Sequence, residues 1–156
     1  MKKGFTLIEL LVIIAIIGIL STTLAPKLRR SLAKAKDAKA VAVLGAARIA
    51  GSVAVTDRMV KNDSGTLTIT FEDITSGLDT KTNELIDDTN DNKIPVGGIE
   101  KDDGTFKYGG AVMLNDGTQN LTESTTSITV TDDLQLILTT GIEGDKSTEG
   151  KLWTSY

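Results

Sequence analysis

Residues 2–26, KKGFTLIELLVIIAIIGILSTTLAP, decide the fold of this chain. After two lysines and a glycine, an apolar run of 21 residues extends from Phe5 to Ala25, and a single carboxylate, Glu9, interrupts it. As an α-helix this run would be roughly 30 Å long, which matches the hydrocarbon core of a bilayer. The sequence therefore predicts a membrane-spanning helix in the first 26 residues.

A cleaved signal peptide and a plain signal anchor are alternative interpretations of a basic start followed by an apolar segment. The run is longer than the usual apolar region of a signal peptide, about 7–15 residues. Glu9 also lies one turn inside the segment, where a charged side chain costs on the order of 3 kcal/mol. Such a residue persists mainly where another group pairs with it, so Glu9 indicates a role beyond targeting.

The segment resembles the prepilin signature of type IV pilins and type II secretion pseudopilins. It has a Lys-rich leader ending in Gly4, the sequence Phe-Thr-Leu-Ile-Glu-Leu from Phe5, and an Ile/Leu/Val run with Gly18 and Pro26. The resemblance implies that a prepilin peptidase cleaves between Gly4 and Phe5 and that the new amino group of Phe5 is N-methylated. It also implies that Glu9 serves subunit docking, and that the helix is stored in the inner membrane with its N-terminus in the cytoplasm.

Cleavage after Gly4 would place a cationic amine four residues from Glu9, near one helical turn. The carboxylate could pair with the amine of its own chain or with that of a neighbour displaced along a filament axis. In an apolar bundle this attraction is stronger than in water, but desolvation offsets much of it. We therefore expect Glu9 to set subunit register more than to add affinity.

Gly18 and Pro26 each have a simple interpretation. Glycine in membrane helices often only lets helices approach closely, and proline kinks a helix because it removes a hydrogen bond. Similarity to pilins instead implies that the segment between them loosens when the subunit leaves lipid for the filament. The residues assigned to assembly are Phe5, Glu9, Gly18 and Pro26.

Beyond Pro26 the sequence predicts that the helix continues to about Lys61, before the polar stop Asn62-Asp63-Ser64-Gly65. Residues 5–61 would form one helix, or a kinked one, of roughly 85 Å. Because this is too long for the interior of a small domain, its first half must be buried in lipid or in other subunits. The apolar stripe expected on its second half is Leu28, Leu32, Ala35, Ala42, Ala46, Ile49, Val53 and Val60.

A small β-rich head is predicted after the helix, because short apolar segments alternate with Asp, Asn and Gly turn signals. Short connections favour antiparallel pairing. The expected strands are 67–71, 105–108, 110–114, 127–131 and 134–138, with 75–104 as the least structured stretch. The fold class is α+β, a long N-terminal helix packed against a small antiparallel sheet, which is the type IV pilin fold by resemblance. The predicted domains are a leader at 1–4, a membrane and filament-core half-helix at 5–26, an amphipathic half-helix at 27–61 and a head at 62–156.

Charge is divided unevenly along the chain. Residues 1–61 hold 11 Lys or Arg and 3 Asp or Glu, whereas residues 62–156 hold 6 and 18. The basic cluster past the membrane segment has two interpretations: a solvated helix face near lipid head groups, or a basic stem that contacts the acidic head of a neighbour. Its members are Lys27, Arg29, Arg30, Lys34, Lys36 and Lys39.

The chain contains neither Cys nor His. Disulfides are therefore excluded, and the usual acid–base and thiol chemistries are missing. Without a Gly-rich phosphate loop either, the sequence predicts a protein that is not an enzyme. Six aromatic residues and an acidic head also argue against direct binding of nucleic acid.

Calcium is the one cofactor that the sequence suggests. Asp88, Asn90 and Asn92 have the spacing of ligands in a calcium loop. Lys93 occupies the glycine position of that pattern, however, and Ile99 occupies the glutamate position. The alternative is a solvated acidic loop without metal.

Three functions are compatible with these features. The resemblance implies a structural pilin that polymerises into an extracellular pilus for adhesion, twitching motility or DNA uptake. It equally allows a pseudopilin of a type II secretion system, which forms a periplasmic filament. The third function is a membrane-anchored binding module at a filament tip. The implied partners are other copies of the chain, prepilin peptidase, the assembly machinery and the inner membrane.

Overall fold

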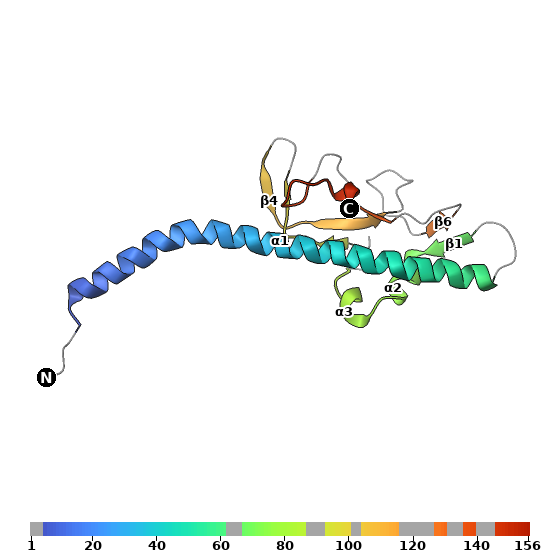
Figure 1. Ribbon diagram of the computed structural model, residues 1–156, viewed down its shortest axis with the longest axis horizontal. Coiled ribbons are helices and arrows are strands. Elements are labelled where there is room, and N and C mark those ends of the chain that lie inside the picture. Colours follow the sequence, from blue (N-terminus) through green and yellow to red (C-terminus); the bar gives the residue numbers. More distant parts are fainter. Residues whose placement is uncertain are drawn as a thin grey trace. The chain divides into compact units, whose positions relative to one another are not determined.

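The computed structural model describes residues 5–61, 67–86, 93–100, 104–115, 127–130, 136–139 and 146–156. By its contacts the chain divides into two compact units, Met1–Leu32 and Ala33–Tyr156, and each is described by itself. In chain order the elements are α1 (Leu7–Lys61), β1 (Leu67–Thr70), α2 (Phe71–Ser76), α3 (Thr80–Asn83), β2 (Lys93–Pro95), β3 (Gly98–Glu100), β4 (Phe106–Tyr108), β5 (Ala111–Asn115), β6 (Ser127–Val130), β7 (Ile137–Thr139) and the 3₁₀ helix η1 (Trp153–Ser155) (Figure 1).

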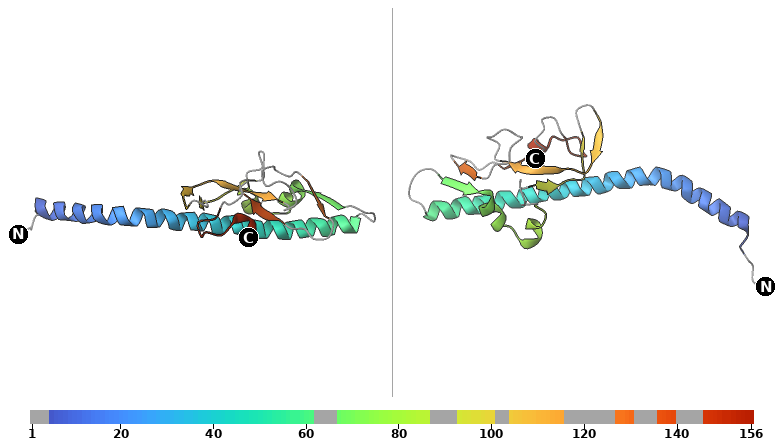
Figure 2. Two further views of the ribbon diagram at one scale, coloured as in Figure 1. Left: turned by 90° about the horizontal axis from the view of Figure 1, so that it is seen from above. Right: turned by 180° about the vertical axis from the view of Figure 1, so that it is seen from behind.

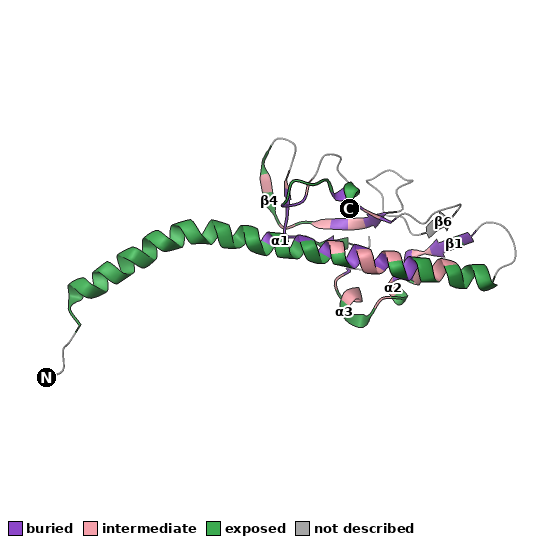
Figure 3. Cartoon of the chain, viewed as in Figure 1, coloured by how far each residue is buried: buried purple, intermediate pink, exposed green. Residues whose placement is uncertain are grey.

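The first unit consists of the N-terminal part of α1, whose apolar side chains are all exposed (Figure 3). Twelve large apolar residues between Leu7 and Leu24 are 43–82% exposed. The hydroxyls of Thr22 and Thr23 donate to the main-chain oxygens of the preceding turn at 2.8 and 3.0 Å, so these polar groups are satisfied within the helix. Among the described residues, α1 is the one helix long and apolar enough to cross a membrane.

The second unit packs the C-terminal half of α1 against small antiparallel sheets (Figures 1 and 2). Their strand orders are β1–β6, β2–β5–β7 and β3–β4. In the three-stranded sheet Ile94 pairs with Val112, and Leu114 pairs with Leu138. All four of these side chains are buried, because they share the face that covers the core. The predicted α+β fold class and antiparallel pairing are confirmed.

The apolar stripe predicted to cover the head was wrong, because it lies on the opposite face of α1. Ile49, Val53 and Val60 are 70, 63 and 82% exposed. The buried face instead carries smaller side chains and one carboxylate, which let the sheets approach the helix closely. Its members are Ala33, Asp37, Ala40, Val43, Leu44, Ala47, Ala50 and Gly51.

Some element boundaries agree with the prediction and others differ. The predicted end of α1 at Lys61 is confirmed. The first strand ends at Thr70 rather than 71, since Thr70 caps α2. The stretch 75–104, expected to be the least structured, contains α3, β2 and β3. In the C-terminal segment, Trp153 is 1% exposed and belongs to the core.

Asp37 attaches the β2–β3 connection and the C-terminal segment to α1. One carboxylate oxygen accepts the N–H of Gly97 at 2.8 Å, and the other accepts the N–H of Thr148 at 2.8 Å and the Thr148 hydroxyl. Gly97 lies so close to the helix that an added Cβ would be 2.0 Å from the main-chain oxygen of Ala33. Only glycine fits at this position, since any larger residue would push the sheet off the helix.

Arg48 makes a second attachment about three turns along the same helix. Its Nε and Nη2 donate to the Leu136 oxygen at 2.9 and 2.7 Å, and its Nη1 donates to the Tyr156 oxygen at 3.0 Å. The C-terminal segment is therefore held to α1 at both Thr148 and Tyr156. Without cysteine, these two charged side chains fix the last segment of the head.

We expect Asp37→Ala to lower the free energy of unfolding of the head by about 3–5 kcal/mol, because it leaves buried donors without an acceptor. Urea unfolding of the full chain in detergent, followed by the fluorescence of Trp153, measures this change. The control Asp57→Asn removes an exposed pair with Lys61 and should change the free energy by less than about 0.5 kcal/mol. Equal stability of Asp37→Ala and the unaltered chain would contradict this account of the attachment.

The hydrogen bonds to Asp73 at the start of α2 should make the stability of the head depend on pH. The N–H of Thr70 donates to Asp73 at 2.9 Å, and this hydrogen bond is the main cause that lowers the pKa of Asp73. Partial burial raises the pKa, whereas Arg58, 3.1 Å from the carboxylate, lowers it further. A lowered pKa in the folded state adds stability above the ordinary aspartate pKa, and this stability is lost as the pH falls toward the lowered value. Between about pH 7 and pH 3, Asp73→Asn should therefore lose less stability than the unaltered chain. Urea midpoints at both pH values test this, and equal losses would disprove it.

Candidate assembly site

Thr6 and Glu9, at the start of α1, close the first turn of the helix by reciprocal hydrogen bonds. The Thr6 N–H donates to Glu9 Oε2 at 2.8 Å, and the Thr6 hydroxyl donates to the same oxygen at 2.7 Å. In return, the Glu9 N–H donates to Thr6 Oγ1 at 3.3 Å. This arrangement is a capping box, with Thr6 as the N-cap and Glu9 as the third helical residue. The carboxylate also lies at the positive end of the helix dipole.

The capping box gives Glu9 a partner within its own chain. In the uncleaved chain this partner is Thr6, and pairing with the Phe5 amine that cleavage would create stays a prediction. Both hydrogen bonds fall on Oε2, and Oε1 accepts none from the described residues. Glu9 therefore has one oxygen engaged in helix capping and one oxygen available for a further donor.

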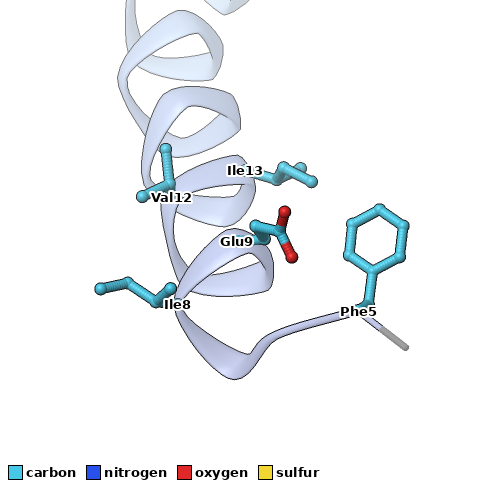
Figure 4. Close-up of a pocket in the computed structure, with 5 residues that line it drawn as sticks. All are labelled: Phe5, Ile8, Glu9, Val12 and Ile13. Carbon is cyan, nitrogen blue, oxygen red and sulfur yellow. The ribbon is translucent and has the colours of Figure 1, made fainter. Parts of the chain in front are cut away.

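Apolar side chains surround this carboxylate. Phe5, Ile8, Val12 and Ile13 line an open depression around Glu9, and Figure 4 shows the Phe5 ring on the same side of the helix as the carboxylate. Phe5 is 81% exposed and Ile8 is 68% exposed. Once lipid or another subunit covers these side chains, water is excluded and any charge that approaches Oε1 interacts with it more strongly.

The other predicted assembly residues lie farther along α1. Gly18 has open space around the position of a Cβ, and Pro26 lies inside the helix, which continues on both sides of it. The segment between them is helical in the structure, so its loosening outside lipid stays a prediction.

The proposed cleavage and calcium sites lie partly or wholly outside the described residues. Gly4 precedes them, and the three proposed ligands fall in the gap at 87–92. Elsewhere in the described chain, no group of three or more Asp or Glu is placed to hold a metal ion. Cleavage after Gly4 stays a prediction, as does calcium binding by Asp88, Asn90 and Asn92.

Sequence reasoning missed the roles of Thr6 and Asp37. Thr6-Leu7-Ile8-Glu9 fits the Thr-x-x-Glu signature before an apolar run, so the capping box was open to prediction. Asp37 gave no local signal, because its hydrogen-bond donors are 60 and 111 residues away in the sequence.

We expect Thr6→Val to destabilise the first turn of α1 by about 1 kcal/mol, because valine cannot cap the helix. Hydrogen exchange and carbon chemical shifts of residues 6–9 in detergent should show loss of helix there. Thr6→Ser keeps the hydroxyl and should retain the turn. A fully helical first turn in Thr6→Val would show that the capping box is not needed.

Comparison with known proteins adds one finding for this segment. Residues 1–25 match the family model described as the prokaryotic N-terminal methylation motif, and the matched range includes both residues of the capping box. No solved structure matches the chain. The long N-terminal helix followed by small antiparallel sheets fits the pilin fold. The chain therefore carries the prepilin-type motif of type IV pilins and pseudopilins.

Proposed function

We propose that this chain is a structural subunit of a type IV pilus, which polymerises through α1 into an extracellular filament for adhesion, motility or DNA uptake. The observation that carries the proposal is the exposed apolar first half of α1, residues 7–24, which we call the stem. At its start, within the methylation motif, the carboxylate of Glu9 closes the capping box with Thr6. Before assembly the subunit is a membrane-anchored precursor with its N-terminus in the cytoplasm, and prepilin peptidase cleaves between Gly4 and Phe5.

The cost of exposing the stem to water supports self-assembly. Burying a large apolar side chain contributes about 1.5–3 kcal/mol. For the twelve exposed residues from Leu7 to Leu24, the total is on the order of 20 kcal/mol, which exceeds the stability of a typical domain. A processed subunit therefore leaves lipid only when other apolar surfaces cover the stem at once. The stems of other copies supply such surfaces.

The free oxygen of Glu9 supports a role in register. After cleavage, the amine of Phe5 lies one residue before the helix N-cap, in the same shell of apolar side chains. Because Oε2 is engaged with Thr6, Oε1 can accept the amine of a neighbouring copy without loss of the helix cap. A copy docked one step out of register would leave both charges unpaired in an apolar environment, which is costly.

The second unit also exposes a helix face that suits contact between copies. Between Lys39 and Asp57 the only charged residue of α1 is Arg48, and its guanidinium group binds main-chain oxygens of the head. The outer face of these turns is therefore uncharged, and it includes the exposed Ile49. Gly45 has open space around the position of a Cβ, so packing against the described residues does not explain a helix-interior glycine, which costs up to about 1 kcal/mol relative to alanine.

The proposal predicts a processed N-terminus and a charge requirement at residue 9. Mass spectrometry of the protein from its native cell should find a chain that begins with N-methylated Phe5. Glu9→Gln keeps the capping geometry but removes the charge, so filaments should be lost while the first turn stays helical. Glu72→Gln on the exposed surface of α2 is the matched control and should assemble normally.

Electron microscopy of sheared surface material, with an antibody to the head, separates the possible filaments. Long surface fibres agree with a pilus, and labelling confined to fibre ends indicates a tip subunit. Absence of surface fibres at native expression would contradict the assignment to a pilus and favour a type II secretion pseudopilus. A native product that still begins at Met1, or full assembly of Glu9→Gln, would contradict the proposed role of the N-terminal site.

A further inference from the structure

Three exposed cations follow the apolar segment of α1 directly. Lys27, Arg29 and Arg30 come immediately after Pro26 in the first unit, and all three side chains are exposed. Successive residues of an α-helix are rotated by about 100°, so the three cations lie within an arc of about 160° on one side of the helix. We name Lys27, Arg29 and Arg30 the basic collar.

The described part of the chain offers the basic collar no anion. The ion pairs found there join Lys34 to Glu149, Arg58 to Asp73 and Lys61 to Asp57. After Glu9, the next acid in the sequence is Asp37, and hydrogen bonds from Gly97 and Thr148 occupy its carboxylate. The collar is therefore open to an anion that the described residues do not supply.

We propose that the basic collar binds the phosphate groups of anionic lipids at the membrane surface that the C-terminal end of the apolar segment reaches. The apolar run from Phe5 to Ala25 has the length of the hydrocarbon core, which places the next residues among the lipid head groups. Two arginines in the collar present planar donor groups that match phosphate oxygens in pairs. The collar thereby fixes how deeply the stem lies in the bilayer.

The position of the collar favours lipid over the acidic head of another copy. All three cations lie within five residues of Ala25, the end of the apolar run, so they are placed at the level of the lipid head groups. Attraction to an anionic membrane surface is strong only within about a Debye length, and the collar lies within that distance of the predicted boundary.

The test measures the lipid preference of the full chain in bilayers of phosphatidylcholine. Spin-labelled phosphatidylglycerol and spin-labelled phosphatidylcholine are compared by the fraction immobilised at the protein. A single effective contact corresponds to a preference of about fivefold for the anionic lipid. We expect at least that preference for the unaltered chain and most of it to be lost in the triple variant Lys27→Gln, Arg29→Gln, Arg30→Gln.

A matched triple variant on the head provides the control. Lys81→Gln, Lys107→Gln and Lys151→Gln remove the same charge from exposed positions and should keep the lipid preference. The fluorescence of Trp153 verifies that all variants are folded. An unaltered chain without preference for phosphatidylglycerol, or equal preference in both triple variants, would overturn the proposal.

The inference depends on the stem spanning a bilayer and not on the type of filament, so its failure is separate from failure of the proposed function. Filaments that form normally from a chain without lipid preference would refute only the collar. A collar variant with full lipid preference, whose filaments dissociate at lower salt than those of the unaltered chain, would refute lipid binding. That result would assign the collar to contacts with the acidic head of another copy.

Discussion

The head of this protein depends on one close contact with its helix, at which Gly97 lies against the backbone of Ala33 and both oxygens of Asp37 accept hydrogen bonds. The contact fixes the β2–β3 connection and the C-terminal segment together, although they are far apart in the sequence. Arg48 holds the C-terminal segment at a second place on the same helix. Because a buried carboxylate is costly unless its hydrogen bonds are made, only the correct placement of both segments satisfies Asp37.

The stem is governed by a different constraint, which is that its apolar side chains are exposed in the described part of the chain. In lipid this exposure is favourable, and there is then little hydrophobic force between helices. Outside lipid the same surface must be covered at once. The capping box at Thr6 and Glu9 lets the stem carry a carboxylate in an apolar environment, because that carboxylate already accepts two hydrogen bonds.

Features encoded locally were predictable from the sequence. The apolar run, the end of α1 at Lys61 and several strand positions follow from periodicity and turn residues, which act over a few positions. The orientation of the second half of α1 was not predictable in this way. That half has apolar residues on two faces, and the larger residues, such as Ile49, suggested the wrong one. The sheets pack instead on the face of smaller residues, because it allows closer approach.

By itself, the sequence determined that the chain begins with a long helix able to enter a membrane, that a carboxylate lies one turn inside it, and that an antiparallel head follows. These properties depend on composition and short-range spacing. Only the tertiary structure decided which face of α1 the head covers and that Asp37 and Arg48 attach the C-terminal segment. These attachments join residues tens of positions apart, so they cannot be read from local sequence pattern alone.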